Sequence, residues 1–178
     1  MIKKKSLFLI LLLTTTITIG IVCVYSASLV KTGDRPRNVS AISPEMKQQI
    51  LRDAENMKTV DDVISYSMKQ TSRLLRFGEH NDLDRGKANC VGYAQVGSEI
   101  CNRAFRAASI DAEARPVVGY ISLCGVNVCW VMKNIVPHEF SSFVKDHDFV
   151  EITTGGKKIY VDPSAYDYLG ATWETIKR

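Results

Sequence analysis

The pattern of apolar residues changes once along the chain, near Ala114, and this change constrains the fold more than any other feature. Before it, apolar residues recur at three- and four-residue spacing, which is typical of helices. After it, β-rich runs alternate with turn residues. Helices followed by strands predict an α+β fold with an antiparallel sheet rather than an alternating parallel fold.

Three helices are expected before the change. The first follows an N-cap at Ser43 and has proline at its first position, and the second opens at Thr59 with Asp62 as an acidic variant of the capping box. The third begins at Cys90, directly after a polar loop that is rich in turn residues. The predicted helical ranges are 44–54, 59–77 and 90–108.

Two hairpins are expected after the change. The runs ARPVVGYISL and VCWVMKNIV should pair about Gly125-Val126-Asn127. The runs DFVEITT and KKIYVD should pair about Gly155-Gly156.

An uncharged run of nineteen residues, Leu7–Tyr25, follows three lysines near the N-terminus. As a helix it would be about 28 Å long, close to the thickness of the hydrocarbon core of a bilayer. The basic flank predicts that everything after Tyr25 lies across the membrane from the cytoplasm. The length favours an uncleaved signal-anchor, a transmembrane helix within residues 1–25. The alternative is a cleaved signal peptide with its exit at Ser26-Ala27-Ser28 and a secreted product.

The remainder divides into a polar stretch and one domain. Residues 26–42 contain Gly33 and Pro36 and have no apolar period, so we expect a linker there. The chain of 178 residues has room for one ordinary core, which we place in residues 43–178.

Charge argues against a nucleic-acid partner. The chain has 23 Lys and Arg against 19 Asp and Glu, a net charge of +4. Lys3, Lys4 and Lys5 supply three of these charges, which leaves a net +1 for residues 31–178. A nucleic-acid surface needs clustered basic charge, and the sequence offers none.

Three residues stand where a thiol-based catalytic site needs them. Cys90 begins a helix, where unpaired N–H groups and the helix dipole favour the thiolate and could also hold an oxyanion. His147 opens a strand, and Asp162 closes the next one. If the second hairpin forms, His147 and Asp162 face each other at its open end. The imidazole would then pair with the thiolate and protonate a leaving amine, while the carboxylate orients the ring.

The same segments resemble the transglutaminase-like family. The run KANCVGYAQVGSEICNRAFRAASIDAEARPVVGYIS is similar to its Cys-bearing helix and the Ala-Arg-x-Val-x-Gly-Tyr text that follows. HDFVEI resembles its His-Ala-Trp-Val-Glu-Val strand, with Phe149 where a Trp is common, and IYVDPSA resembles its Val-Asp-Pro-Thr segment. The resemblance covers roughly residues 85–165. It implies a papain-like fold, with Cys90 as nucleophile, His147 as base and Asp162 as orienting acid.

The resemblance implies an enzyme that forms a thioester from a peptide or carboxamide bond. Small members of the family include peptidases, amidases and acyltransferases, and the shared residues do not choose between them. The expected partner is a peptide or protein substrate, and no cofactor is expected. Two alternatives are a non-catalytic binding module for peptides or envelope polymers and a structural anchor protein. A lapsed enzyme usually loses a triad residue, and all three are present.

Other polar residues carry further expectations. Tyr93 and Asn89 are expected at the substrate-binding lip of the cleft, Cys101 in the core, and Trp130 in packing contacts. Cys124 and Cys129 flank the first hairpin turn, and a disulfide between them is possible. A zinc site from both cysteines with His138 and His147 has looser spacing than usual, so no metal is expected.

Overall fold

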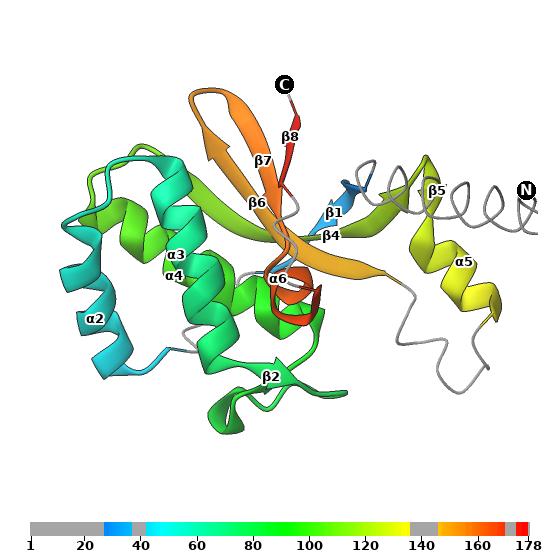
Figure 1. The fold of residues 1–178 in the computed structure, drawn as a ribbon, viewed down its shortest axis with the longest axis horizontal. Coiled ribbons are helices and arrows are strands. Elements are labelled where there is room, and N and C mark those ends of the chain that lie inside the picture. Colours follow the sequence, from blue (N-terminus) through cyan, green and yellow to red (C-terminus); the bar gives the residue numbers. More distant parts are fainter. Residues whose placement is uncertain (1–26, 37–41, 136–145, 170–173, 178) are drawn as a thin grey trace, which may run out of the picture.

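The computed structural model describes residues 27–36, 42–135, 146–169 and 174–177, and Figure 1 shows the arrangement of its elements. The elements in chain order are β1 (Ser28–Asp34), α2 (Pro44–Ala54), α3 (Val60–Leu74), β2 (Arg76–Phe77), a 3-10 turn η1 (Leu83–Arg85), β3 (Lys87–Ala88), α4 (Cys90–Ala107), β4 (Glu113–Leu123), β5 (Val126–Asn127), α5 (Val128–Ile135), β6 (His147–Thr154), β7 (Lys157–Val161), α6 (Pro163–Leu169) and β8 (Glu174–Lys177).

The main sheet has the strand order β1-β4-β6-β7-β8, and β5 pairs with the end of β4. Every pair of neighbouring strands in it is antiparallel. Strands β2 and β3 form a separate, short parallel pair. The prediction of an α+β fold with an antiparallel sheet is therefore confirmed.

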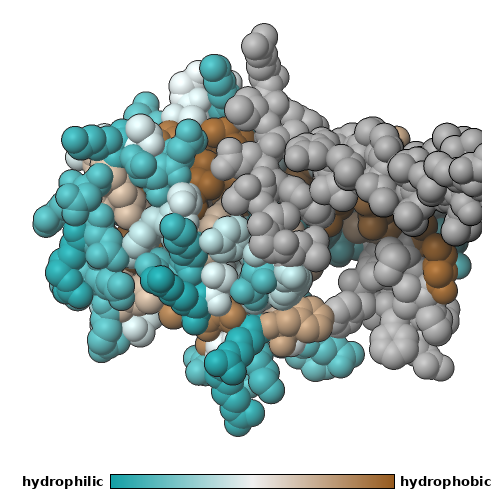
Figure 2. Space-filling view, viewed as in Figure 1, coloured by the Kyte–Doolittle hydropathy of each residue, from teal (hydrophilic) through white to brown (hydrophobic). Residues whose placement is uncertain are grey.

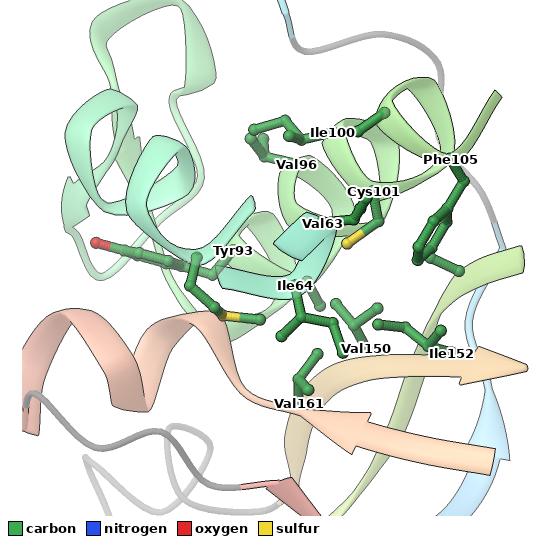
Figure 3. Packing of buried hydrophobic residues seen from close by; sticks show 14 of the residues in the cluster. Val63, Ile64, Tyr93, Val96, Ile100, Cys101, Phe105, Val150, Ile152 and Val161 are labelled. Atoms are coloured by element: carbon green, nitrogen blue, oxygen red, sulfur yellow. The ribbon is translucent and has the colours of Figure 1, made fainter. Parts of the chain in front are cut away.

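The core lies between one face of this sheet and the helices α2, α3 and α4. Figure 3 shows side chains of α3 and α4 directed towards Val150, Ile152 and Val161 of β6 and β7. The outer side of α2 and α3 is largely hydrophilic (Figure 2). Burial of this amphipathic helix layer is the main source of stability expected for such a fold. Cys101 is fully buried in the core, as predicted.

The helix starts follow the capping residues read from the sequence. The Ser43 hydroxyl accepts the Met46 N–H at 3.2 Å, and Thr59 and Asp62 form a reciprocal capping box. These starts are predictable because each cap lies within three residues of the donor it satisfies. The second predicted hairpin is also present, since β6 and β7 pair out to Thr154 and Lys157 about the two glycines.

The predicted linker over residues 26–42 is wrong for residues 28–34. They form β1, whose partner in the sheet is β4. As an edge strand, β1 has only Leu29 fully buried, so its sequence lacks the apolar alternation of an interior strand. Gly119 of β4 accommodates it, because a Cβ on Gly119 would overlap the Val30 carbonyl oxygen. The folded domain thus includes residues that precede position 43.

The second strand of the first predicted hairpin is also wrong. Only Val126 and Asn127 pair with β4, and residues 128–135 form the helix α5. Its start is stabilised by the Asn127 side chain, which accepts the Trp130 N–H at 2.9 Å. The β-branched residues in this segment favour a strand, and the local cap overrides that preference.

Within the ranges that the structure describes, no helix is long and apolar enough to cross a bilayer. The expected membrane segment, Leu7–Tyr25, lies outside those ranges.

Candidate active site

The β6–β7 hairpin brings His147 and Asp162 together. His147 is the first residue of β6, and Asp162 directly follows β7. The pairing of Val150 with Val161 closes the separation along the chain, and His147 Nε2 lies 2.5 Å from Asp162 Oδ2. The expectation that the two side chains meet at the open end of the hairpin is confirmed.

Asp162 is held rigidly by the start of α6. Its Oδ1 atom accepts the Ser164 N–H at 3.0 Å, the Ser164 hydroxyl at 2.7 Å and the Ala165 N–H at 3.0 Å. The carboxylate is buried, which alone would raise its pKa. The charge and hydrogen bond of His147, together with these donors, outweigh burial and lower the pKa of Asp162. The group is therefore a fixed carboxylate at neutral pH.

Cys90 is placed by the cap of α4. The Asn89 side chain accepts the Val91 N–H at 3.1 Å, and the Asn89 N–H donates to Asn81 Oδ1 at 3.0 Å. This ties the helix start to the preceding loop. Gly92 allows the contact, since a Cβ there would lie 2.5 Å from Asn81 Oδ1. The glycine two residues after the thiol thus lets the loop and the helix meet closely.

Cys90 and His147 line the same cavity, the thiol is half-buried, and the Cys90 sulfur is close enough to the imidazole to raise its pKa. Because Nε2 of the ring binds Asp162, the other ring nitrogen is the one available to Cys90. The three residues line one cavity of about 420 Å³. Its walls also include Phe77, Glu79, His80, Asn89, Val91, Ile121, Asp146, Ser164, Ala165 and Tyr168.

The His147 ring is poised to carry a positive charge. Its side chain is 16% exposed, and burial alone would lower its pKa. The Asp162 carboxylate, through charge and a hydrogen bond, and the Cys90 sulfur raise the pKa of His147 well above 6.5. An imidazolium between a thiolate and a carboxylate is the arrangement that stabilises a nucleophilic sulfur.

We expect His147 to titrate well above pH 6.5 and Asp162→Asn to lower its midpoint, because that change removes the largest favourable charge. Histidine-selective NMR of the full chain can resolve the signal, since the sequence has three histidines. The free energy of unfolding should fall as pH rises through the raised His147 pKa, and also as pH falls through the lowered Asp162 pKa. A His147 midpoint at or below 6.5 in the unmodified protein would contradict this assignment.

A second ion pair lies directly beside the triad. Arg35, just after β1, donates through Nε to Asp148 Oδ2 at 2.8 Å and through Nη2 to Asp148 Oδ1 at 3.0 Å. The Asp148 side chain is fully buried, and its hydrogen bond and negative charge raise the pKa of Arg35. Sequence reasoning missed Arg35, because it lies in the predicted linker and its partner is 113 residues away.

We expect Arg35→Gln to lower the free energy of unfolding by about 2–4 kcal/mol, since it leaves the buried Asp148 carboxylate unpaired. Adding Asp148→Asn should recover most of the loss. Urea denaturation of the two variants measures both effects. Arg85→Gln is the control, because Arg85 is 80% exposed and its pair with Asp82 spans 3.6 Å. Equal stability of Arg35→Gln and Arg85→Gln would contradict the prediction.

The two predicted lip residues have different outcomes. Asn89 lines the cavity and also caps α4. Tyr93 was wrongly placed: its side chain is fully buried, and its hydroxyl donates to Asp167 Oδ2 at 2.5 Å on α6. Tyr93 lies one turn into α4, and at that point the helix α6 covers it where substrate was expected. Phe77 and Tyr168 of α6 instead supply large aromatic side chains at the cavity, and their rings contact each other edge-to-face.

The disulfide that was possible between Cys124 and Cys129 is not formed in the structure. The possible disulfide assumed two facing strands, whereas Cys129 lies on α5. His138 of the weighed zinc set lies outside the described residues. Among those that are described, no three His, Cys, Asp or Glu residues come close enough to hold a metal ion.

Comparison with known proteins gives no match: no protein-family model fits the chain, and neither a curated protein nor a solved structure is significantly similar to it. The resemblance to the transglutaminase-like family and the papain-like fold stay predictions from sequence. The class that the fold and site define is an α+β protein with a Cys-His-Asp constellation in one cavity.

Proposed function

We propose that the protein is a membrane-tethered, extracytoplasmic thiol enzyme of transglutaminase-like type that acts on peptide or carboxamide bonds. The observation that carries the proposal is that Cys90, His147 and Asp162 line one cavity, where His147 is bonded to Asp162 and lies within the influence of the Cys90 sulfur. Thiol, imidazole and carboxylate in this order supply nucleophile, general acid–base and orienting group. A half-buried thiol at a cavity wall is also accessible to a substrate carbonyl.

The chemistry proceeds in two steps. The Cys90 thiolate attacks the carbonyl carbon, a carbon–sulfur bond forms, and the carbonyl electron pair moves onto oxygen. When the carbonyl re-forms, the carbon–nitrogen bond breaks, and the His147 imidazolium gives its proton to the leaving ammonia or amine. Neutral His147 then takes a proton from water or an amine, which attacks the thioester and releases the thiolate.

The start of α4 limits which backbone groups can hold the oxyanion. The Val91 N–H is already bound by the Asn89 side chain. The Cys90 N–H, at the nucleophile itself, is therefore the candidate donor at this helix end.

The test incubates the full chain in detergent with a library of glutamine-containing peptides, with and without an added primary amine. Mass spectrometry separates cleavage, deamidation and amine incorporation, because each gives a different mass change. Cys90→Ala is the matched control and should give none of them. Peptides that bind but are never altered would overturn the enzyme and support the binding-module alternative.

A further inference from the structure

Exposed hydrophobic side chains gather in one short segment of the domain. Val126, Trp130 and Ile135 are 50%, 65% and 73% exposed. The other exposed large hydrophobic residues of the described chain are Leu51 on α2 and the two aromatic residues of the cavity, Phe77 and Tyr168. Single exposed apolar residues are ordinary, but three within ten residues mark an interaction surface. We call the segment from Val126 to Ile135 the α5 surface.

The charge of this region suits a lipid headgroup layer. No acidic residue occurs between Ala114 and His138, and Arg115 and Lys133 are the only charged residues there. Tryptophan is favoured where an apolar environment meets a polar one, because its ring is apolar and its N–H needs a partner. The short helix α5 places such a ring on the surface, since Trp130 is largely exposed.

The register of β1 fixes where the N-terminal apolar run must be attached. Ser28, the first residue of β1, pairs with Ser122 near the end of β4. Strand β4 leads from there through β5 into α5 (Figure 1). Tyr25, the last residue of the uncharged run, is three residues before Ser28 and so lies within about 11 Å of it. The run therefore joins the domain at the end that carries the α5 surface.

We propose that the α5 surface lies in the headgroup layer of the lipid bilayer into which Leu7–Tyr25 inserts. The inference rests on the proposed membrane insertion and not on the catalytic chemistry. Interfacial segments bury their apolar side chains about 5–10 Å into the boundary between headgroups and acyl chains. Docking there gives the domain a fixed orientation. Ile121, next to Ser122 on β4, lines the same cavity as Cys90. Docking of the α5 surface therefore also keeps Cys90 close to the membrane surface.

Fluorescence of a single tryptophan tests the position of α5. The full chain with Trp173→Phe retains Trp130 alone, and it is reconstituted into phosphatidylcholine–phosphatidylglycerol vesicles with or without brominated acyl chains. We expect the Trp130 emission to shift to the blue in vesicles and to lose most of its intensity with brominated lipid. Val126→Glu combined with Ile135→Glu should restore much of that intensity.

The matched control places a tryptophan at Leu51, which is 51% exposed on α2 at the opposite end of the molecule (Figure 1). In a Trp130→Phe, Trp173→Phe background, Leu51→Trp should stay unquenched by brominated lipid. Trp130 emission that matches this control would overturn the inference while the vesicle-bound chain still inserts. Failure to bind vesicles at all would overturn both membrane proposals. A third outcome is that acrylamide quenches Trp130 fluorescence poorly in detergent, and less as the protein concentration rises. That result would overturn the inference and assign the α5 surface to contact with a second copy of the chain.

The fluorescence results do not depend on whether the protein is an enzyme. Peptide turnover is measured separately in detergent. If no turnover is found while Trp130 is quenched by brominated lipid, only the catalytic proposal is contradicted. If turnover is found while Trp130 stays unquenched, only the proposed position of the α5 surface in the headgroup layer is contradicted.

Discussion

Cys90→Ala is expected to abolish turnover, with a loss of roughly 10⁵-fold or more, to the uncatalysed background. The same change should remove covalent labelling of residue 90 by iodoacetamide at mildly acidic pH. The reason is that the half-buried Cys90 sulfur lies at the cavity wall together with His147, where an alkylating reagent can reach it. Peptide mapping by mass spectrometry identifies which thiol is labelled.

The matched control is Cys101→Ala, a second cysteine of the same helix. Cys101 is fully buried, and burial raises its pKa to about 12, so it offers almost no thiolate. We expect this variant to keep labelling at Cys90. It should also keep turnover when the assay temperature is lowered to offset the stability lost through the cavity in its core. Cavity formation costs stability but leaves the triad intact. If the two alanine variants labelled equally, Cys90 would not be the nucleophile.

Asp162→Asn should lower turnover by about 10²- to 10⁴-fold, with a smaller fall in melting temperature than Asp162→Ala. Asparagine keeps an oxygen at the position of Oδ1, which accepts the Ser164 and Ala165 donors at the start of α6. It removes the negative charge 2.5 Å from His147 Nε2. Catalysis and stability should therefore separate in this variant.

Asp162→Ala provides the comparison. It removes both the charge and the acceptor that caps α6, so turnover and melting temperature should fall together. The loss of the helix cap alone lowers the free energy of unfolding by about 1 kcal/mol or more. Asp167→Asn is the control for charge on the same helix, because its carboxylate binds Tyr93 and is not at the cavity. Turnover of Asp162→Asn at the level of Asp167→Asn would argue against an orienting role for Asp162.

Local features of this protein were predictable from sequence. Ser43, Thr59 and Asn89 each cap a helix through donors no more than three residues away, so the signal lies in a few adjacent letters. The second hairpin was predictable for the same reason, since adjacent glycines with positive φ form its turn. The contact of His147 and Asp162 followed from that one turn.

Features that depend on distant partners were missed. The edge strand β1 has too few buried residues to show a period, and its Arg35 is meaningful only beside Asp148. Tyr93 was misplaced because α6, which covers it, comes more than seventy residues later. The residues of α5 fit a strand as well as a helix by propensity, and the Asn127 cap decided between them.

The strand β1 determines at which point a cut could separate the folded domain from the proposed N-terminal anchor without damaging it. A peptidase that cut at the exit Ser26-Ala27-Ser28 would remove only the first residue of β1, and Leu29 would keep its place in the sheet. Cutting between β1 and α2 would instead leave a strand and Arg35 held to the rest by noncovalent contacts alone. Shedding before Leu29 preserves the folded body, whereas nicking after Arg35 converts one chain into a two-piece assembly.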